Sequence, residues 1–347
     1  MHKTLYKWIA AVAAICCLLS GCGGNSTKTG GPDTSLDVSG AADDLAGLFD
    51  EGSSAKEVGG FSYGWPDERD VFTYSGEPLE IPFQLTGSMD SAQEVGLLLL
   101  VDGIAQPYSA VCSDGTKLDE AYMQTFNLEK DVENRFNMVF QPVTGKTGDS
   151  LSIQAVTILC PSFLPSGTEN PSYGFYHSNN LSIPLRIAYE ADAPAENRRT
   201  STDQFEVTDI PKSVMDTNEY FGMDTDGGDA LDTVNSLSIV SKDGEDSSLL
   251  SSENGFVTFK VRLYGGPEAD NNITIFVNHQ PVQINGADYL AVRTVKGKMV
   301  EATVTLDVSS FGKLNTLYAI ASSTGRDSDL TETLKTDSIL LVNQEGK

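Results

Sequence analysis

The chain has 347 residues, with 23 Lys or Arg against 49 Asp or Glu, so its formal net charge at pH 7 is −26. A surface this acidic repels nucleic acid and anionic membrane lipids, so no nucleic-acid partner is expected and an anionic membrane surface is a poor partner. The length is sufficient for two domains of ordinary size.

The first 22 residues have the layout of a secretory signal. His2, Lys3 and Lys7 make a basic start, and an uncharged apolar run follows from Trp8 to Leu19. At about 12 residues this run is too short to span a bilayer comfortably. An ordinary secretory signal, in which the cysteine after it is incidental, is one interpretation of this layout.

The end of the signal points to a more specific interpretation, because Leu19-Ser20-Gly21-Cys22 resembles the lipobox of bacterial lipoproteins. The resemblance implies that residues 1–21 are removed and that Cys22 carries a diacylglyceryl group and often an amide-linked acyl chain such as palmitate. Two or more acyl chains give stable anchoring, since each buried methylene contributes about 0.8 kcal/mol. The expected location is the extracytoplasmic face of a membrane, at the cell surface or in the periplasm.

Cleavage before Cys22 leaves three of the five cysteines, namely Cys22, Cys112 and Cys160. If Cys22 is acylated, a Cys112–Cys160 disulfide is the one pairing that remains, and it is allowed outside the cytoplasm. It would close a loop of about 48 residues and stabilise the fold by roughly 4 kcal/mol in the chain-entropy model. Two separately buried thiols fit the sequence equally well, because the distance between them cannot be derived from their spacing.

Residues 22–60 comprise the lipidated cysteine and a segment rich in Gly, Ser, Thr, Asp and Ala with few aromatic residues. This composition predicts a flexible tether, with a root-mean-square span of roughly 35 Å.

After Gly60 apolar residues recur with a period of two, which is the pattern of strands with one buried face. Ile81, Phe83 and Leu85 alternate with polar positions, and so do Val257, Phe259 and Val261. Pro82 and Pro184 lie within two of these stretches and predict edge positions, since proline cannot donate to a sheet ladder. No long helical stripe follows the tether, so an all-β fold is expected.

The order of strands repeats along the chain. In each half a strand ends in Val-Asp-Gly (101–103) or Val-Asn-His (277–279), makes a tight turn and continues into a short strand. About seven strands per half is typical of a β-sandwich. This feature resembles bacterial immunoglobulin-like domains, and it implies two tandem sandwiches over 61–190 and 205–347, joined by a linker over 191–204.

Two aromatic groups are candidate ligand-binding residues. Tyr63 and Trp65 lie in one cluster, and Tyr173, Phe175 and Tyr176 lie in another, before the last strand of the first half. Exposed aromatic rings stack on sugars and anchor protein interfaces. The alternative is that these rings cover the ends of the sandwich core.

An acidic loop offers a candidate calcium site. Asp224, Asp226, Asp229 and Asp232 surround two glycines, and calcium binds several closely spaced carboxylates on such loops. The bidentate Glu of the standard helical loop is absent, so a solvated acidic loop is the alternative. No other cofactor is expected.

Gly148-Asp149-Ser150-Leu151 spells the motif of a large hydrolase family, but no Asp-x-x-His follows to supply a base. The motif therefore predicts a hairpin turn, and no catalytic residue is assigned. The function expected is that of a non-enzymatic, lipid-anchored binding or scaffolding protein that engages another protein of the bacterial envelope. A glycan-binding lipoprotein that uses the aromatics, and an unrecognised extracytoplasmic hydrolase, are the alternatives.

Overall fold

A computed structural model of the chain describes residues 60–66, 69–88, 93–169, 171–212, 214, 235–325 and 333–346. Residues 22–59 of the predicted tether, including Cys22, and the candidate calcium loop at Asp224–Asp232 lie outside the described residues. Glu57–Lys347 forms one compact unit. None of the described helices is long and apolar enough to cross a membrane.

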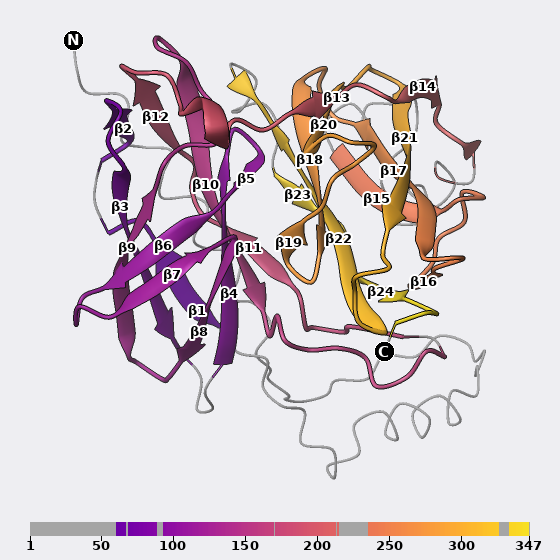
Figure 1. Cartoon of the computed structure of the whole chain (residues 1–347), viewed down its shortest axis with the longest axis horizontal. Coiled ribbons are helices and arrows are strands. Elements are labelled where there is room, and N and C mark those ends of the chain that lie inside the picture. Colours follow the sequence, from indigo (N-terminus) through magenta and orange to yellow (C-terminus); the bar gives the residue numbers. More distant parts are fainter. Residues whose placement is uncertain are drawn as a thin grey trace, which may run out of the picture. The chain divides into compact units, whose positions relative to one another are not determined.

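The first half folds into two facing sheets (Figure 1). One sheet contains, in spatial order, β1 (Phe61–Gly64), β3 (Leu79–Gly87), β9 (Glu133–Phe140), β6 (Tyr108–Cys112) and β7 (Lys117–Ala121). The other contains β2 (Val71–Tyr74), β12 (Leu185–Tyr189), β10 (Ser150–Leu159), β4 (Gln93–Val101) and β5 (Ile104–Gln106), with β11 (Asn179–Leu181) beside β10 and β8 (Met123–Leu128) beside β4.

The second half repeats this arrangement. Its larger sheet contains β13 (Ser201–Thr202), β20 (Tyr289–Arg293), β18 (Asp270–Val277), β22 (Leu314–Ser323), β24 (Ile339–Val342) and β16 (Leu249–Ser251), with β19 (Gln280–Pro281) beside β18 and β23 (Leu334–Lys335) beside β22. Its smaller sheet contains β14 (Glu206–Asp209), β21 (Lys298–Asp307), β17 (Phe256–Gly265) and β15 (Asn235–Ser241).

Alternation of apolar residues explains why each pair of sheets closes on a core. Leu79, Ile81, Phe83 and Leu85 of β3 all point into the first core, and the polar residues between them face outward. The ring of Phe83 lies 6.0 Å from that of Phe136, which is stacked at 4.5 Å on Phe126. The second core is built in the same way from β17 and β21.

Both halves have immunoglobulin-like topology, so the predicted fold class is confirmed. β1 belongs to one sheet while β2 joins the other sheet and pairs in parallel with the last strand, β12. β15 and β16 do the same in the second half, where β16 runs parallel to β24. Pro82 lies in the part of β3 beyond the reach of β1, which pairs only with Gln84–Gly87.

Residues 191–204, which the sequence suggested as a linker, take part in both sandwiches. Ala193 is buried and its backbone N–H donates to the Gly145 carbonyl at 3.0 Å. A single 3-10 turn, Ala195–Asn197, follows. Ser201–Thr202 then forms β13, which pairs in parallel with β20. This connection is therefore packed structure rather than a loose joint.

Candidate functional site

The two sandwiches pack against each other through equivalent strands, β4 and β10 of the first and β18 and β22 of the second. These strands are buried on both faces. In β4, Leu97 and Leu99 belong to the first core, whereas Leu98 and Leu100 belong to a third apolar cluster shared with the second sandwich. At its centre the rings of Phe276 and Tyr318 stack at 5.1 Å. We call this region the seam, defined by the cluster Leu98, Leu100, Ala105, Val156, Ile158, Phe276, Tyr318 and Ile320.

Each of the two repeated tight turns forms hydrogen bonds with the other sandwich. Asp102 and Gly103 have φ values of 51° and 76°, and this turn receives hydrogen bonds from the second sandwich. Asn272 Nδ2 donates to the Asp102 carbonyl at 2.9 Å, and the Gly325 N–H donates to Asp102 Oδ1 at 2.9 Å. Burial raises the pKa of the Asp102 carboxyl above its usual range, although the Gly325 hydrogen bond opposes the shift.

The second turn makes the reciprocal contact. Asn278 and His279 have φ values of 48° and 65°. His279 Nε2 lies 2.8 Å from the Pro161 carbonyl of the first sandwich, and its Nδ1 lies 3.1 Å from the Tyr318 hydroxyl. Because a carbonyl can only accept, Nε2 carries the proton and Nδ1 accepts from Tyr318. Burial lowers the pKa of His279, so the ring is held neutral.

A second histidine lies beside the first. His177 is 2% exposed, and its ring centroid is 5.3 Å from that of His279. Its Nδ1 is 3.1 Å from the hydroxyl of Ser338 in the second sandwich. Burial lowers the pKa of His177 to about 3, with further contributions from His279 and Lys335. His177 is therefore neutral throughout the physiological pH range.

The ammonium group of Lys335 contacts Tyr318 and Ser338, which also bind the two histidines. Its ammonium lies 4.8 Å from the centroid of the Tyr318 ring and donates to the Thr336 carbonyl at 3.0 Å. It also donates to the Ser338 hydroxyl at 3.3 Å. Burial lowers the pKa of Lys335 to about 8, and Asp337 opposes the shift. The charge is thus satisfied within the protein and by the face of an aromatic ring.

Gly103 should tolerate a side chain worse than a comparable turn glycine. A Cβ at Gly103 would lie 3.0 Å from the Ser322 Cβ across the seam, and its φ is +76°. We expect Gly103→Val to lower the free energy of unfolding by about 2 kcal/mol or more. Gly115→Val is the matched control, because Gly115 has φ +87° and nothing within 4 Å. Equal losses in urea unfolding for the two variants would contradict a tight seam at this turn.

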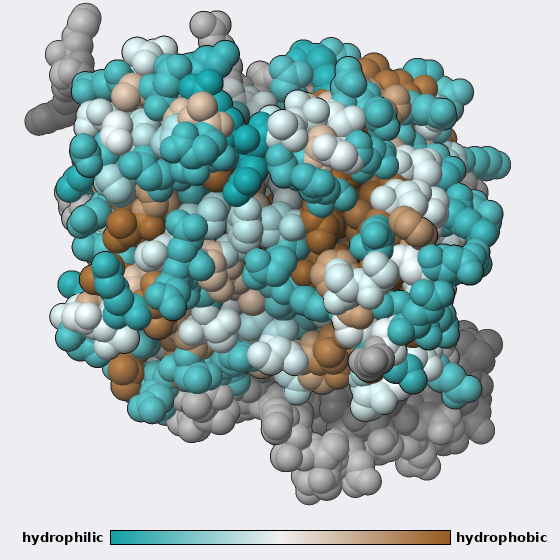
Figure 2. All heavy atoms as spheres, in the orientation of Figure 1, coloured by the Kyte–Doolittle hydropathy of each residue, from teal (hydrophilic) through white to brown (hydrophobic). Residues whose placement is uncertain are grey.

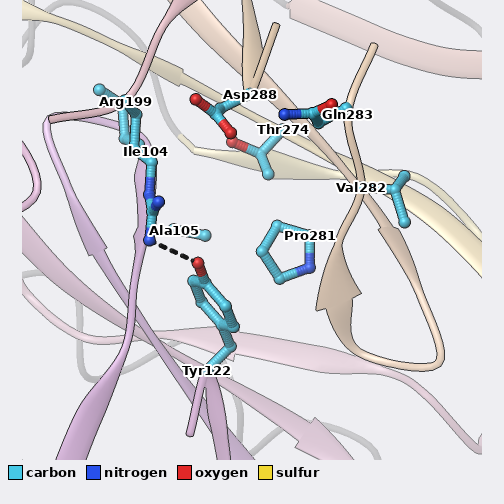
Figure 3. A pocket seen from close by; sticks show the side chains of 9 residues that line it. All are labelled: Ile104, Ala105, Tyr122, Arg199, Thr274, Pro281, Val282, Gln283 and Asp288. Atoms are coloured by element: carbon cyan, nitrogen blue, oxygen red, sulfur yellow. Dashed lines mark hydrogen bonds between the residues drawn. The ribbon is translucent and has the colours of Figure 1, made fainter. Parts of the chain in front are cut away.

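A small cavity lies at one end of the seam (Figure 3). Its volume is about 50 Å³, and Ile104 and Ala105 of the first sandwich line it opposite Thr274 and Pro281 of the second. The Arg199 guanidinium, which also lines the cavity, donates to the Tyr122 hydroxyl at 2.7 Å (Figure 3). The cavity has room for a water or two and not for an organic ligand.

Larger concavities lie beside β15 and the break between β23 and β24. Two cavities of about 340 and 500 Å³ share a wall made of Ser248 and Thr336–Ser338. The first is bounded by Tyr176 of the connection between β10 and β11 and by Asn179, the first residue of β11. The second is bounded by Leu237–Ile239 of β15. We call the two together the groove. Both volumes fall within or near the range of natural ligand sites.

The predicted aromatics divide between structural and exposed positions. Trp65 packs edge-on against Phe83 at 4.8 Å and donates to the Ile183 carbonyl at 2.7 Å. Tyr63 donates to the Leu181 carbonyl at 3.1 Å. Both hold the segment before β12 against the first sandwich, so they cover the end of the core.

The second aromatic group is spread over three environments. Tyr173 is buried in the seam, where its hydroxyl is 2.9 Å from Thr316 Oγ1. Phe175 is 70% exposed. Tyr176 is half-buried, lines the groove, and its ring lies 4.0 Å from that of Phe163. Of the five predicted aromatics, Phe175 and Tyr176 remain in positions suited to an external ligand.

Cys112 ends β6 in one sheet and Cys160 follows β10 in the other, and both are half-buried thiols in this structure. Among the described residues no group of three or more His, Cys, Asp or Glu side chains is arranged to hold a metal ion.

The hydrolase-like motif Gly148–Leu151 lies at a turn. Gly148 and Asp149 form this turn, in which the Asp149 side chain accepts from the Lys146 N–H at 2.7 Å, and Ser150 begins β10.

The chain resembles some solved structures, but it matches no known protein family. No protein-family model matches the chain, and no curated protein matches it. One similar structure is the CsuC–CsuE chaperone–tip adhesion subunit pre-assembly complex of Acinetobacter baumannii, at 9% identity and a TM-score of 0.21, covering 80% of this chain and 98% of that one. Another is the N-terminal domain of PorA, at 13% identity and a TM-score of 0.21, covering 32% of this chain and 100% of that one. The PapD-like domain 7 of human CEP192 matches at 14% identity and a TM-score of 0.20, covering 39% and 86%. Identities and scores this low carry no functional argument.

The seam residues were not predicted from the sequence, and a signal for them was present. β4 contains four consecutive leucines, Leu97–Leu100, and β22 reads Leu-Tyr-Ala-Ile-Ala from Leu317 to Ala321. A continuous apolar run indicates a strand buried on both faces, unlike the alternating run of β3. His177 and His279 are also buried, beside the seam.

Proposed function

We propose that the protein is a non-enzymatic, lipid-anchored binding or scaffolding module of the bacterial envelope that engages another envelope protein. The lipobox resemblance at Cys22 supports the anchorage and the extracytoplasmic location. The acidic composition supports a soluble body that is held near a membrane without adhering to its anionic surface.

The observation that carries the proposal is a pair of exposed apolar side chains on the segment between β10 and β12, which includes β11. Phe175 and Ile183 are 70% and 78% exposed, and the other exposed large hydrophobic side chains of the described residues are all below 50%. Both lie between β10 and β12. Tyr173 and His177 attach this connection to the second sandwich, and Trp65 attaches it at Ile183. Pre-organised apolar anchors lose little entropy on binding, which is what a protein interface needs.

Most of the face shown in Figure 2 is hydrophilic, and its hydrophobic residues appear in areas separated by hydrophilic ones. Small apolar anchors on a polar surface are typical of transient or regulated protein contacts.

The test is site-specific photo-crosslinking in the native host. A photoreactive residue at position 175 or 183 should capture one defined envelope protein, whereas the same residue at Ser62, an exposed position on β1, should not. The adduct should disappear when Cys22→Ala releases the protein from the membrane. Membrane pelleting and lipid labelling unchanged by Cys22→Ala would refute the anchor, and identical adducts from all three positions would refute the interface.

A further inference from the structure

The groove beside β15 has polar lining residues that neither the seam nor the proposed protein interface uses, beside Tyr173 and His177, which it shares with the contact between the sandwiches. Its walls are rich in hydroxyl groups, contributed by Ser172, Ser178, Ser238, Ser247, Ser248 and Thr336. The side chains of Ser178, Asn179, Ser248 and Asp337 make no hydrogen bond or ion pair with any other described residue. A set of unengaged donors and acceptors within one concavity is suited to a ligand that offers many hydroxyl groups.

One aromatic ring stands at the end of this polar wall. Tyr176 lines the groove, and the Phe163 ring at 4.0 Å, tilted by 30°, supports it from one side. The backbone N–H of Tyr176 donates to the Tyr173 carbonyl at 2.9 Å, and the Tyr173 hydroxyl is fixed to Thr316 across the seam. A supported ring of this kind offers an apolar face on which the C–H face of a pyranose can stack.

The charges of the groove restrict the ligand further. Asp246 and Asp337 are exposed in its walls, and the Lys335 ammonium is already bonded to Thr336 and Ser338. The chain as a whole has a formal net charge of −26 at pH 7. Anionic ligands are therefore repelled, whereas uncharged hydroxyls can donate to the two carboxylates.

The geometry points to a binding site for a neutral oligosaccharide in this groove, with Tyr176 as the stacking platform and Asn179, Ser248 and Asp337 as hydrogen-bonding partners. The two cavities of about 340 and 500 Å³ provide room for more than one sugar ring. Shared lining by Thr336–Ser338 makes them consecutive subsites along the break between β23 and β24. This site goes beyond the proposed function, because Phe175 and Ile183 do not line it.

The test uses the full chain and a panel of hexasaccharides: maltohexaose, cellohexaose, xylohexaose, the N-acetylglucosamine hexamer and, as the anionic counterpart, the galacturonic acid hexamer. Saturation-transfer NMR and calorimetry should show at least one neutral member binding with a Kd of roughly 1 mM or below. The galacturonic acid hexamer should not bind. No binding by any neutral member, or equal binding by the anionic one, would overturn the assignment.

Matched variants locate the binding. Tyr176→Ala and Asp337→Ala should each weaken the bound oligosaccharide about tenfold, equivalent to about 1.4 kcal/mol. Phe175→Ala is the control, since this neighbouring ring is exposed but does not line the groove, and it should leave the Kd within about twofold. Loss of binding in Phe175→Ala with retention in Tyr176→Ala would place the sugar on the loop tip and refute the groove. Binding of an unfolded peptide in competition with the sugar would likewise contradict a saccharide-specific site. The crosslinking result at positions 175 and 183 is independent of all these outcomes.

Discussion

Tyr318→Ala is expected to lower the free energy of unfolding by about 3–5 kcal/mol. Tyr318 is fully buried, stacks on Phe276 at 5.1 Å and lies under the Lys335 ammonium at 4.8 Å. Its removal opens a cavity in the seam and leaves His279 Nδ1, which accepts from its hydroxyl, without that partner. An unpaired buried nitrogen adds about 1–3 kcal/mol to the loss.

The same substitution should also uncouple the two sandwiches. Trp65 lies in the first sandwich and is the one tryptophan after the signal segment, so its fluorescence follows the unfolding of that half. Far-UV circular dichroism follows both halves. In the parent chain the two urea transitions should coincide, and in Tyr318→Ala they should separate.

Tyr318→Phe is the matched control for that experiment. It keeps the stacked ring and the cation–π contact and removes only the hydroxyl. We expect a loss of about 1–2 kcal/mol and coincident transitions. Unfolding of Tyr318→Ala at the parent midpoint would show that the seam contributes little to stability.

Acidification is expected to destabilise the protein below about pH 6.5 through the buried histidines. Burial lowers the pKa of His177 to about 3, whereas the unfolded chain takes up a proton near pH 6.5. The unfolded state therefore binds more protons between these values, and stability present above pH 6.5 is lost as the pH falls. His177 alone gives a slope of up to about 1.4 kcal/mol per pH unit, or roughly 1.6 kcal/mol between pH 6.5 and 5. His279, whose pKa is also lowered, acts in the same direction.

Between pH 6.5 and 5 the unfolded chain protonates His177 and His279, the histidines that follow the signal segment, and a histidine variant separates their effect from that of carboxyls such as Asp102, whose pKa burial raises. Urea unfolding at half-unit pH intervals measures the slope. The His177→Gln variant removes one titrating ring, and its slope in that window should be about 1.4 kcal/mol per pH unit shallower. A parent slope that the substitution leaves unchanged would mean that the proton uptake lies elsewhere.

Most of the strands that build the cores could be predicted from the sequence, because their apolar residues alternate. The alternating stretches at Ile81–Leu85 and Val257–Val261 lie within β3 and β17. β7, which reads Lys-Leu-Asp-Glu-Ala from Lys117, was not predicted. It lies at the edge of its sheet, and its residues are exposed or half-buried, so its sequence has no alternation of apolar and polar residues to detect.

The seam and the groove were not predicted from the sequence, for different reasons. The continuous apolar run Leu97–Leu100 indicates a strand buried on both faces, but it does not say what covers the second face. The groove depends on a break between β23 and β24 and on the placement of Tyr176 against Phe163, which are tertiary facts. Tyr63 and Trp65 looked like a binding cluster because the sequence does not show that Leu181 and Ile183 accept their hydrogen bonds.

The Asp102–Gly103 turn contacts the second sandwich and the Asn278–His279 turn contacts the first, and this exchange of equivalent contacts has the form of an isologous dimer interface. Equivalent strands, β4 with β10 and β18 with β22, meet across it, as identical patches do when two copies of one subunit pair. The two halves of this chain therefore behave as a dimer whose subunits are covalently joined. Either half alone would expose the strand faces that carry Leu98 and Leu100 or Phe276 and Tyr318. The joining of the subunits also allows their surfaces to diverge, so that one connection can present Phe175 while the other half contributes β15 to a separate groove.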